Sequence, residues 1–319
     1  MVTGGAGYIG SITTRRLLDV GHEVVVLDTL EKGHKSAVDA RAILVTGDVG
    51  DKGLLDEVLP GIDAVMHLAG YIEVGESQSN PGRYFRNNVS APLTMLEAMV
   101  RHDILALVFS STAAVYGNPV TVPIDEKAEL SPVNVYGASK LMFEQLLDWY
   151  ELAHGLRSVR YRYFNVAGAW PGGVLGEAHE PESHLIPRIL IAMASGQQEF
   201  EVFGSDYRTP DGTCVRDYIH VCDLAEAHLL GLEWVRKEGR SDVFNLGNGR
   251  GYSNLEVVAT CAEVTGHQVN IVKGPRRPGD AAVLVASSDK VTRMLGWQPE
   301  RSSLAQMIGD AWAWHRVRL

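Results

Sequence analysis

Apolar and polar residues along the first half of the chain fall into two alternating patterns. In the first pattern apolar residues follow one another without a break, which is typical of strands buried on both faces of a parallel sheet. These strands are predicted at residues 23–28, 42–46, 63–69 and 106–111, with a further strand at 157–164. In the second pattern apolar residues recur every three or four positions, which predicts helices at residues 11–20, 92–101 and 139–152. The alternation predicts an α/β protein with a doubly wound parallel sheet.

The pattern becomes irregular after Asn165. Glycine, proline and histidine are frequent between residues 168 and 184. Helices are predicted at residues 185–195, 255–265 and 304–314, with a short strand at 243–246. We therefore expect a first domain at residues 1–165 and a smaller C-terminal lobe at residues 166–319. The two are interleaved rather than joined by a linker, and part of residues 215–250 returns to the first domain.

The first strand of the sheet is predicted to be weak. Only Met1, Val2 and Thr3 precede a glycine-rich loop, whereas strands usually have about five or six residues. A clipped chain or a misassigned start codon would produce such a strand.

Composition narrows the class of protein. The chain has 319 residues, 45% of them apolar, and its net charge of −10 argues against a nucleic acid or an anionic membrane as partner. Its three cysteines show no metal-ligand spacing and no disulfide framework, which favours a reducing compartment. The sequence contains no run of about 18 apolar residues and no signal-peptide pattern. We therefore expect a cytoplasmic protein without a metal site.

A glycine-rich loop opens the chain between the first strand and the first helix. Gly5, Gly7 and Gly10 fit the G-x-G-x-x-G pattern of dinucleotide-binding loops, in which the pyrophosphate lies at the helix N-terminus. Asp28 ends the next strand, where a carboxylate accepts the adenosine ribose hydroxyls and repels a 2′-phosphate, so NAD is favoured over NADP. Asp48 follows a later strand, and we expect it near the adenine. The alternatives are a helix-cap or turn role for Asp28 and a turn role for Asp48.

Tyr136 and Lys140 are four residues apart, a spacing that places two side chains on one face of a helix. A nearby ammonium favours phenolate and lowers the pKa of a tyrosine from about 10 toward neutrality, which makes it usable as a general base. Thr112 follows a buried strand at the sheet edge that faces the ligand crevice, so its hydroxyl can hydrogen-bond a substrate oxygen beside Tyr136. The alternatives are an unrelated surface Tyr/Lys pair and an ordinary turn residue.

The glycine loop, the hydroxyl and the Tyr/Lys pair together resemble the extended short-chain dehydrogenase/reductase superfamily. Relatives that dehydrate or decarboxylate nucleotide sugars typically carry acids just after the hydroxyl, but this chain has Ala113 and Ala114 there. Residues 204–221, Tyr163-Phe164-Asn165 and Pro275-Arg276-Arg277-Pro278-Gly279-Asp280 resemble the UDP-glucose 4-epimerase family, and the resemblance covers essentially the whole chain.

The resemblance implies an isomerase of galactose metabolism that interconverts UDP-galactose and UDP-glucose through a transient 4-keto sugar. NAD is expected to stay bound through turnover, because the redox change is internal. Tyr136, Lys140 and Thr112 are the expected catalytic residues. In the family Arg216 and Arg277 hold the diphosphate, and a surface salt bridge is the alternative for either arginine.

The resemblance also implies two sets of binding residues. The residues expected to bind NAD are Gly4, Gly7, Tyr8, Ile9, Gly10, Asp28, Thr29, Asp48, Val49, Leu68, Ala69, Gly70, Asn87, Ser110, Tyr136, Lys140 and Phe164. Those expected to bind substrate are Thr112, Asn165, His184, Leu185, Phe203, Arg216, Tyr218, Arg277, Asp280 and Leu284, with Phe203 near the uracil and Asp280 on the uridine ribose. Leu284 stands where related enzymes set the volume of the sugar pocket.

Three positions depart from the family pattern. This chain has Ile72 where some members have lysine, His184 where some have asparagine, and Thr112 where many have serine. Two other functions stay open: an epimerase of UDP-N-acetylglucosamine or UDP-glucuronate, and a catalytically silent dinucleotide-binding regulator. The intact Tyr136/Lys140 pair counts against the regulator.

We also expect a homodimer. The helix from Ser139 onward carries more apolar surface than one sheet contact needs, and family members pair such helices into a four-helix bundle between subunits. The apolar residues are Leu141, Met142, Phe143, Leu146, Leu147, Trp149 and Tyr150. Burial under the second lobe is the alternative.

The role given to Asp28 leads to a test of cofactor choice. Protein stripped of its cofactor should regain activity with NAD and not with NADP, because the carboxylate repels a 2′-phosphate. Asp28→Asn should lower the ratio of activity with NAD to activity with NADP by about tenfold, the equivalent of ~1.4 kcal/mol. Asp48→Asn is the matched control, and it should leave that ratio unchanged. Equal recovery of the unaltered protein with both cofactors would contradict the assignment.

Overall fold

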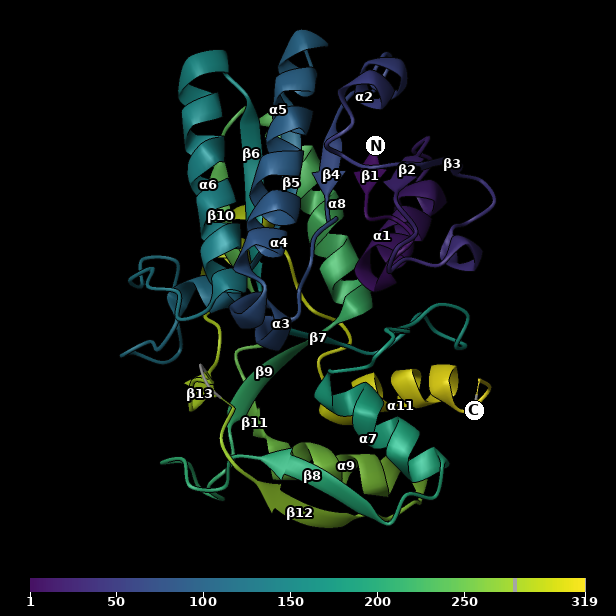
Figure 1. Ribbon diagram of the computed structural model, residues 1–319, viewed down its shortest axis with the longest axis vertical. Helices are drawn as coiled ribbons and strands as arrows, with labels where there is room; N and C mark the ends of the chain where they lie inside the picture. Colours follow the sequence, from purple (N-terminus) through teal and green to yellow (C-terminus); the bar gives the residue numbers. More distant parts are fainter. Residues whose placement is uncertain (278–279, 319) are drawn as a thin grey trace.

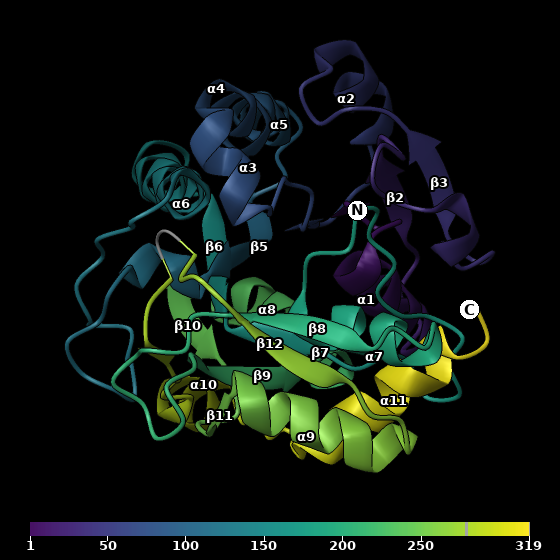
Figure 2. The same ribbon diagram turned by 60° about the horizontal axis from the view of Figure 1, so that its bottom comes forward.

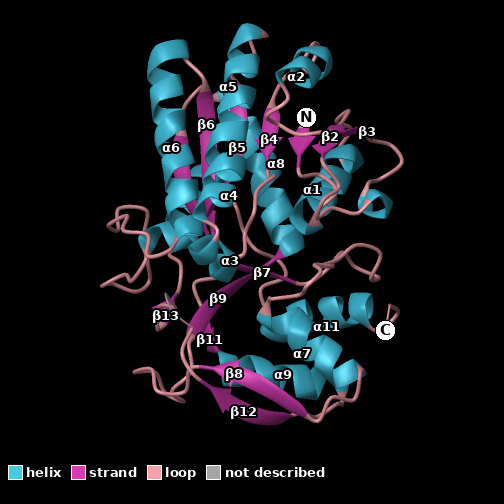
Figure 3. Cartoon of the chain, viewed as in Figure 1, coloured by secondary structure: helices cyan, strands magenta, loops and turns pink. Residues whose placement is uncertain are grey.

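The computed structural model of the protein describes residues 1–277 and 280–318. The upper part of the molecule in Figures 1 and 3 is built on a seven-stranded sheet, whose strands are all parallel. The order across this sheet is β10-β6-β5-β4-β1-β2-β3. The strands are β1 (Val2–Thr3), β2 (Val25–Asp28), β3 (Ile43–Thr46), β4 (Val65–His67), β5 (Ala106–Thr112), β6 (Arg157–Tyr163) and β10 (Asp242–Leu246).

Helices cover both faces of the large sheet, as Figure 2 shows. One face carries α1 (Tyr8–Asp19) and α8 (Val221–Lys237), and the other carries α2 (Lys52–Val58), α5 (Ala91–Arg101) and α6 (Val135–His154). The shorter pieces are 3-10 turns at Lys35–Ala37 and Ala113–Tyr116, α3 (Val74–Ser79), α4 (Pro81–Phe85) and a π-helical turn at Arg86–Ser90. The predicted doubly wound parallel sheet is therefore confirmed. Across the described residues, we find no helix with the length and apolarity needed to span a bilayer.

The strand order reverses between β1 and β4. The chain first adds β2 and β3 on one side of β1, and then places β4, β5 and β6 on the other side. Such a reversal leaves a crevice at the carboxyl ends of the strands, which is where ligands bind in this class of fold. β1 is short, as predicted, with only two residues, yet Val2 is paired on both sides, with Val26 and with Met66.

A smaller lobe lies below the carboxyl ends of the large sheet (Figure 1). β9 (Val215–His220) is its central strand and pairs with β7 (Asn165–Ala167), β11 (Gly251–Ser253) and β13 (Val283–Leu284). A separate parallel pair is formed by β8 (Glu199–Phe203) and β12 (Asn270–Gly274). The helices are α7 (Leu185–Ala194), α9 (Asn254–Thr265), α10 (Asp289–Leu295) and α11 (Leu304–His315). A second hydrophobic core forms among α7, α9 and α11.

The start of α6 and the whole of α8 are among the features that the apolar pattern did not place. α6 begins at Val135, four residues before the predicted start, because the side chain of Asn134 accepts the N–H of Gly137 at 2.8 Å and caps the helix. α8 was not predicted at all. Its buried residues include Asp223 and His228, which are polar and so interrupt the apolar periodicity that identifies a helix.

A buried ion pair joins α6 to the two strands on which it packs. Arg162 on β6 and Glu144 on α6 are 2.6 Å apart, and 4% of each side chain is exposed. The hydroxyl of Ser111 on β5 donates to the same carboxylate, and Arg162 also donates to the hydroxyl of Tyr116 at 2.9 Å. Other side chains therefore hydrogen-bond both charged groups of the pair, as the burial of an ion pair requires.

Candidate active site

A cavity of about 1310 Å³ lies at the carboxyl ends of the large sheet, between this sheet and the smaller lobe. Its wall includes the glycine loop before α1, the ends of β2, β4 and β5, and the start of α6. The loop between β7 and α7 and the segment around β13 close it from the other side. The cavity is thus where the strand order predicts a ligand site.

The three predicted catalytic residues meet in this cavity. Tyr136 lies in the first turn of α6, Lys140 one turn later, and Thr112 is the last residue of β5. The ammonium of Lys140 donates to the carbonyl oxygen of Ser110 at 2.9 Å. The Thr112 hydroxyl accepts the N–H of Ala114 at 3.1 Å.

Small residues allow α6 to approach the end of β5. A Cβ on Gly137 would lie 2.6 Å from the carbonyl oxygen of Ala114, so any larger residue would push the helix away. The side-chain cap of Asn134 fixes the start of the same helix. The close contact brings Tyr136 within hydrogen-bond reach of Thr112.

The structure corrects the expected direction of the Tyr136 pKa. Burial raises the pKa of Tyr136 above its usual 10.0, the hydrogen bond with Thr112 lowers it in part, and the carboxylate of Glu73 raises it further. Burial also lowers the pKa of Lys140, which is 3% exposed, from 10.5 to about 8. Each group on its own is driven toward its neutral form because its charge is poorly solvated. The lysine is therefore not a sufficient cause of a phenolate at neutral pH.

The glycine loop and the start of α1 fit the pyrophosphate of a dinucleotide. α1 begins after Gly7, so the backbone N–H groups of Tyr8 and Ile9 have no partner within the helix. A Cβ on Gly7 would meet only the carbonyl oxygen of Gly4, at 3.4 Å, and would otherwise fill the cavity in front of the helix end. The space is therefore kept open where free N–H groups and the helix dipole favour an anion.

Asp28 is held at the rim of the same cavity. Its carboxylate accepts the N–H of Ala6 and the N–H of Leu30, both at 2.9 Å, and 9% of the residue is exposed. These bonds leave further lone pairs on both oxygens for ligand hydroxyls. Asp28 thus has the turn role that the sequence left as the alternative, and it keeps acceptor capacity for the ribose contact, which stays a prediction.

The far end of the cavity carries the predicted diphosphate residues. Arg216 and Asp280 lie 3.5 Å apart, and 11% of the arginine side chain is exposed. The guanidinium of Arg277 lies 4.4 Å from the centre of the Phe203 ring. Phe203 is not among the residues that line the cavity, and its expected place near the uracil stays a prediction. Pro278 and Gly279 of the same motif lie outside the described residues.

Every other predicted site residue lines the cavity. Those from the NAD set are Gly4, Gly7, Tyr8, Ile9, Gly10, Asp28, Thr29, Asp48, Val49, Leu68, Ala69, Gly70, Asn87, Ser110, Tyr136, Lys140 and Phe164. Those from the substrate set are Thr112, Asn165, His184, Leu185, Arg216, Tyr218, Arg277, Asp280 and Leu284. Ile72, the position of the missing lysine, also lies in this wall.

Two groups in the cavity wall were missed by sequence analysis. Arg83 binds Glu31 at 2.7 Å, and the hydroxyl of Tyr71 donates to the same carboxylate at 2.7 Å, which links the loops after β2 and β4. These residues are far apart in the sequence, so no spacing identifies them. The second group lies within residues 177–184, of which only His184 was predicted, and the pattern Glu-x-His-x-x-Glu-x-His is a local signal that could have found the others.

Comparisons with known proteins agree with this site. A family model described as the NAD dependent epimerase/dehydratase family matches residues 1–247. The UDP-glucose 4-epimerase of Halalkalibacterium halodurans is 50% identical over 319 residues, which cover 99% of this chain and 95% of that protein. The crystal structure of UDP-glucose 4-epimerase from Brucella ovis in complex with NAD is 43% identical with a TM-score of 0.95, covering 99% of this chain and 97% of that chain.

The structure of the Bifidobacterium longum UDP-glucose 4-epimerase in complex with NAD⁺ and UDP is 38% identical with a TM-score of 0.93, covering 98% of this chain and 97% of that chain. These likenesses run through both lobes and through the whole cavity. The chain belongs to the NAD dependent epimerase/dehydratase family, among its UDP-glucose 4-epimerases.

Proposed function

We propose that the cavity inverts C4 of a UDP-hexose, with UDP-galactose and UDP-glucose as the two partners of the reaction. One observation carries this proposal: Tyr136, Lys140 and Thr112 come from two elements and meet in a cavity that also holds a dinucleotide loop. Ala113 and Ala114 follow Thr112, so the acids typical of sugar dehydratases have no equivalent there.

Tyr136 acts as the proton acceptor for the C4 hydroxyl and returns the proton at the end of the reaction. NAD, when held by the glycine loop, would supply a hydride acceptor. Thr112 orients the hydroxyl, because it ends β5 in the same cavity wall as Tyr136 at the start of α6. Lys140 stabilises the phenolate once it forms, because its buried ammonium is held by a single neutral carbonyl oxygen at 2.9 Å.

The uridine diphosphate is held away from the reacting carbon. Arg216 and Arg277 lie at the far end of the cavity, and planar guanidinium groups bind phosphate oxygens in pairs. The structure of the Bifidobacterium longum relative contains UDP, which supports this class of substrate. A diphosphate anchored at one end leaves the sugar free to turn and present either face to Tyr136.

A homodimer is proposed from the outer surface of α6. Met142, Trp149 and Leu152 are exposed by 44%, 66% and 77%, although all three are apolar. They recur along one side of the helix, which stands beside α5 on the outer face of the large sheet (Figure 1). The described part of the second lobe leaves them uncovered, so pairing with a second copy is the proposed way to bury them. The three free cysteines support a reducing compartment, and we place the protein in the cytoplasm.

The reaction and its base can be tested together. Purified protein mixed with UDP-galactose and no added cofactor should produce UDP-glucose. Tyr136→Phe should slow turnover by about two to four orders of magnitude, the usual effect of losing a general base, while UDP binding stays near normal. Calorimetry with UDP provides that control. Turnover of the variant close to that of the unaltered protein would refute the assigned base.

Leu284 should tune the sugar that is accepted. It lies half-buried in β13, directly opposite Arg216 in the strand pairing. An acetamido group at C2 needs room, and overpacking costs about 1–3 kcal/mol, or roughly 5- to 150-fold in specificity. We expect weak activity on UDP-N-acetylglucosamine, an increase in Leu284→Ser and a decrease in Leu284→Tyr. An unchanged ratio of the two sugar activities in both variants would leave Leu284 with an ordinary packing role.

The proposed dimer surface can be tested by charge substitution. The unaltered protein should sediment as a dimer at micromolar concentration, and Trp149→Glu with Leu152→Glu should shift it to monomer, because four carboxylates would be buried in the contact. Val120→Glu is the control, since Val120 is fully exposed elsewhere on the surface. Monomer alone in the unaltered protein would rule the surface out.

A further inference from the structure

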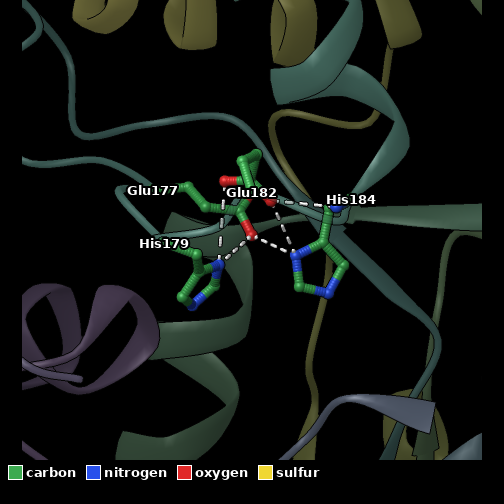
Figure 4. A group of neighbouring side chains, drawn as sticks. All are labelled: Glu177, His179, Glu182 and His184. Carbon is green, nitrogen blue, oxygen red and sulfur yellow. Dashed lines mark hydrogen bonds and ion pairs between the residues drawn. The ribbon is translucent and has the colours of Figure 1, made fainter. Parts of the chain in front are cut away.

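Four metal-ligating side chains converge in the loop between β7 and α7. They are Glu177, His179, Glu182 and His184, and one ligand atom from each lies within 4.8 Å of the others. Figure 4 shows all four side chains pointing toward one another. We call residues 177–184 the convergent loop. Two imidazoles and two carboxylates in eight residues are a donor set that transition metals bind.

The nitrogen–oxygen distances within the cluster match those between ligands of one metal ion better than those of direct ion pairs. The Oε1 atom of Glu177 lies 2.7 Å from Nδ1 of His184 and 3.2 Å from Nδ1 of His179. The Oε1 atom of Glu182 lies 3.4 Å from Nδ1 of His184, and its Oε2 atom lies 3.8 Å from Nδ1 of His179. Four ligands bound at about 2.1 Å around a tetrahedral ion stand roughly 3.4 Å from one another. Only one of the four separations is as short as a charged hydrogen bond usually is.

The orientation of the atoms supports the same centre. Nδ1 of both histidines and Oε2 of Glu182 are buried, and within the described chain none of them has a hydrogen-bond partner. A carboxylate oxygen lies only 2.7 Å from the His184 nitrogen, so the missing bond is a matter of direction and not of distance. The Glu177 and Glu182 side chains are each only 7% exposed. Buried donors and acceptors that face a common point and not each other need a third partner.

We propose that the convergent loop binds one divalent transition metal of the zinc class. Glu177, His179, Glu182 and His184 supply two nitrogen and two oxygen ligands in tetrahedral arrangement. Imidazole ligands select zinc and its neighbours over calcium and magnesium, which prefer oxygen ligands alone. The site has four protein ligands and no open position, so its role is structural and not catalytic.

A metal in the convergent loop would stabilise the cavity wall, because the loop contacts three other parts of the chain. The convergent loop is tied to the loop after β2, to the start of α3 and to α11. These ties are His34 to the Ala178 carbonyl at 2.8 Å, Ser183 to Glu73 at 2.8 Å, and Trp314 to the Glu177 carbonyl at 2.8 Å. A metal at its centre would brace the part of the cavity wall that lies against the NAD-binding elements.

The metal would also set the chemistry of His184. Its Nδ1 faces the cluster, whereas its other ring nitrogen points away from it and 42% of the side chain is exposed (Figure 4). Coordination at Nδ1 leaves the proton on Nε2, which makes that edge a fixed hydrogen-bond donor in the cavity wall. This part of the inference rests on the proposed substrate role of His184, while the metal site itself does not.

The alternative to a bound metal is that both histidines of the cluster are protonated. In that case the two imidazoles are charged and form ion pairs with the carboxylates, which raise the pKa of His179 to about 9 against the opposing effect of burial. Protons and a metal make different predictions for metal content, which can be measured without any assay of the enzyme.

The first experiment measures metal in the intact protein. Protein purified without chelator and then dialysed against zinc should hold about one equivalent of zinc per chain, as measured by inductively coupled plasma mass spectrometry. Replacement of zinc by Co²⁺ should give the visible absorption bands of a tetrahedral cobalt site. Protein that takes up neither ion overturns the proposal, and this result needs no variant to fold.

The second experiment locates the metal. His179→Gln and Glu182→Gln should each weaken zinc binding by more than the roughly 10- to 100-fold that loss of an outer-shell partner causes. His102→Gln is the matched control, because His102 pairs with Asp56 at 2.9 Å on the surface, outside the cluster. Zinc should raise the melting temperature of the control and not that of the two loop variants. Equal zinc binding in all three variants places the metal elsewhere and refutes the site.

Discussion

The buried contact between Arg162 and Glu144 sets the geometry on which the site depends. The two charged groups, one on β6 and one on α6, lie 2.6 Å apart, and the hydroxyl of Ser111 on β5 donates to the same carboxylate. Ser111 directly precedes Thr112, and α6 carries Tyr136 two turns before Glu144. Loss of one partner from such a buried pair costs about 3–5 kcal/mol, because the other charge is left without compensation. Helix and strand are therefore fixed together where the catalytic groups meet.

A second buried charge acts on the chemistry and not on the packing. Lys140 is 3% exposed, and within the described residues its ammonium is held by the Ser110 carbonyl and by no carboxylate. Burial disfavours the charged form of Tyr136 and of Lys140 alike, although a pKa of about 8 leaves the lysine mostly charged at neutral pH. In the proposed mechanism a phenolate on Tyr136 would relieve both penalties at once, because each charge would then have a counter-charge in a medium of low dielectric.

The sequence predicted the parts of the fold that depend on local pattern. Uninterrupted apolar runs identified the central strands, and the glycine pattern identified a loop that lines the cavity. α8 was missed because Asp223 and His228 are buried within it. The contact of Phe203 with Arg277 could not be predicted either, because it depends on how β8 packs against a loop more than 70 residues later. Spacing also gave the wrong sign for the pKa of Tyr136, since spacing measures proximity of charge and not loss of solvent.

The place of β10 in the large sheet has a consequence for how the protein can be made. Asp242–Leu246 pairs with Val159–Tyr163 of β6, and the intervening chain builds β7, α7, β8, β9 and α8 before it returns. On a ribosome, the edge of β6 therefore stays open until the segment around residue 246 has left the exit tunnel. An open edge strand is a template for pairing with other chains. The interval between synthesis of β6 and of β10 is thus the period in which a nascent chain is most exposed to aggregation, and no single cut in the chain would separate the two lobes intact.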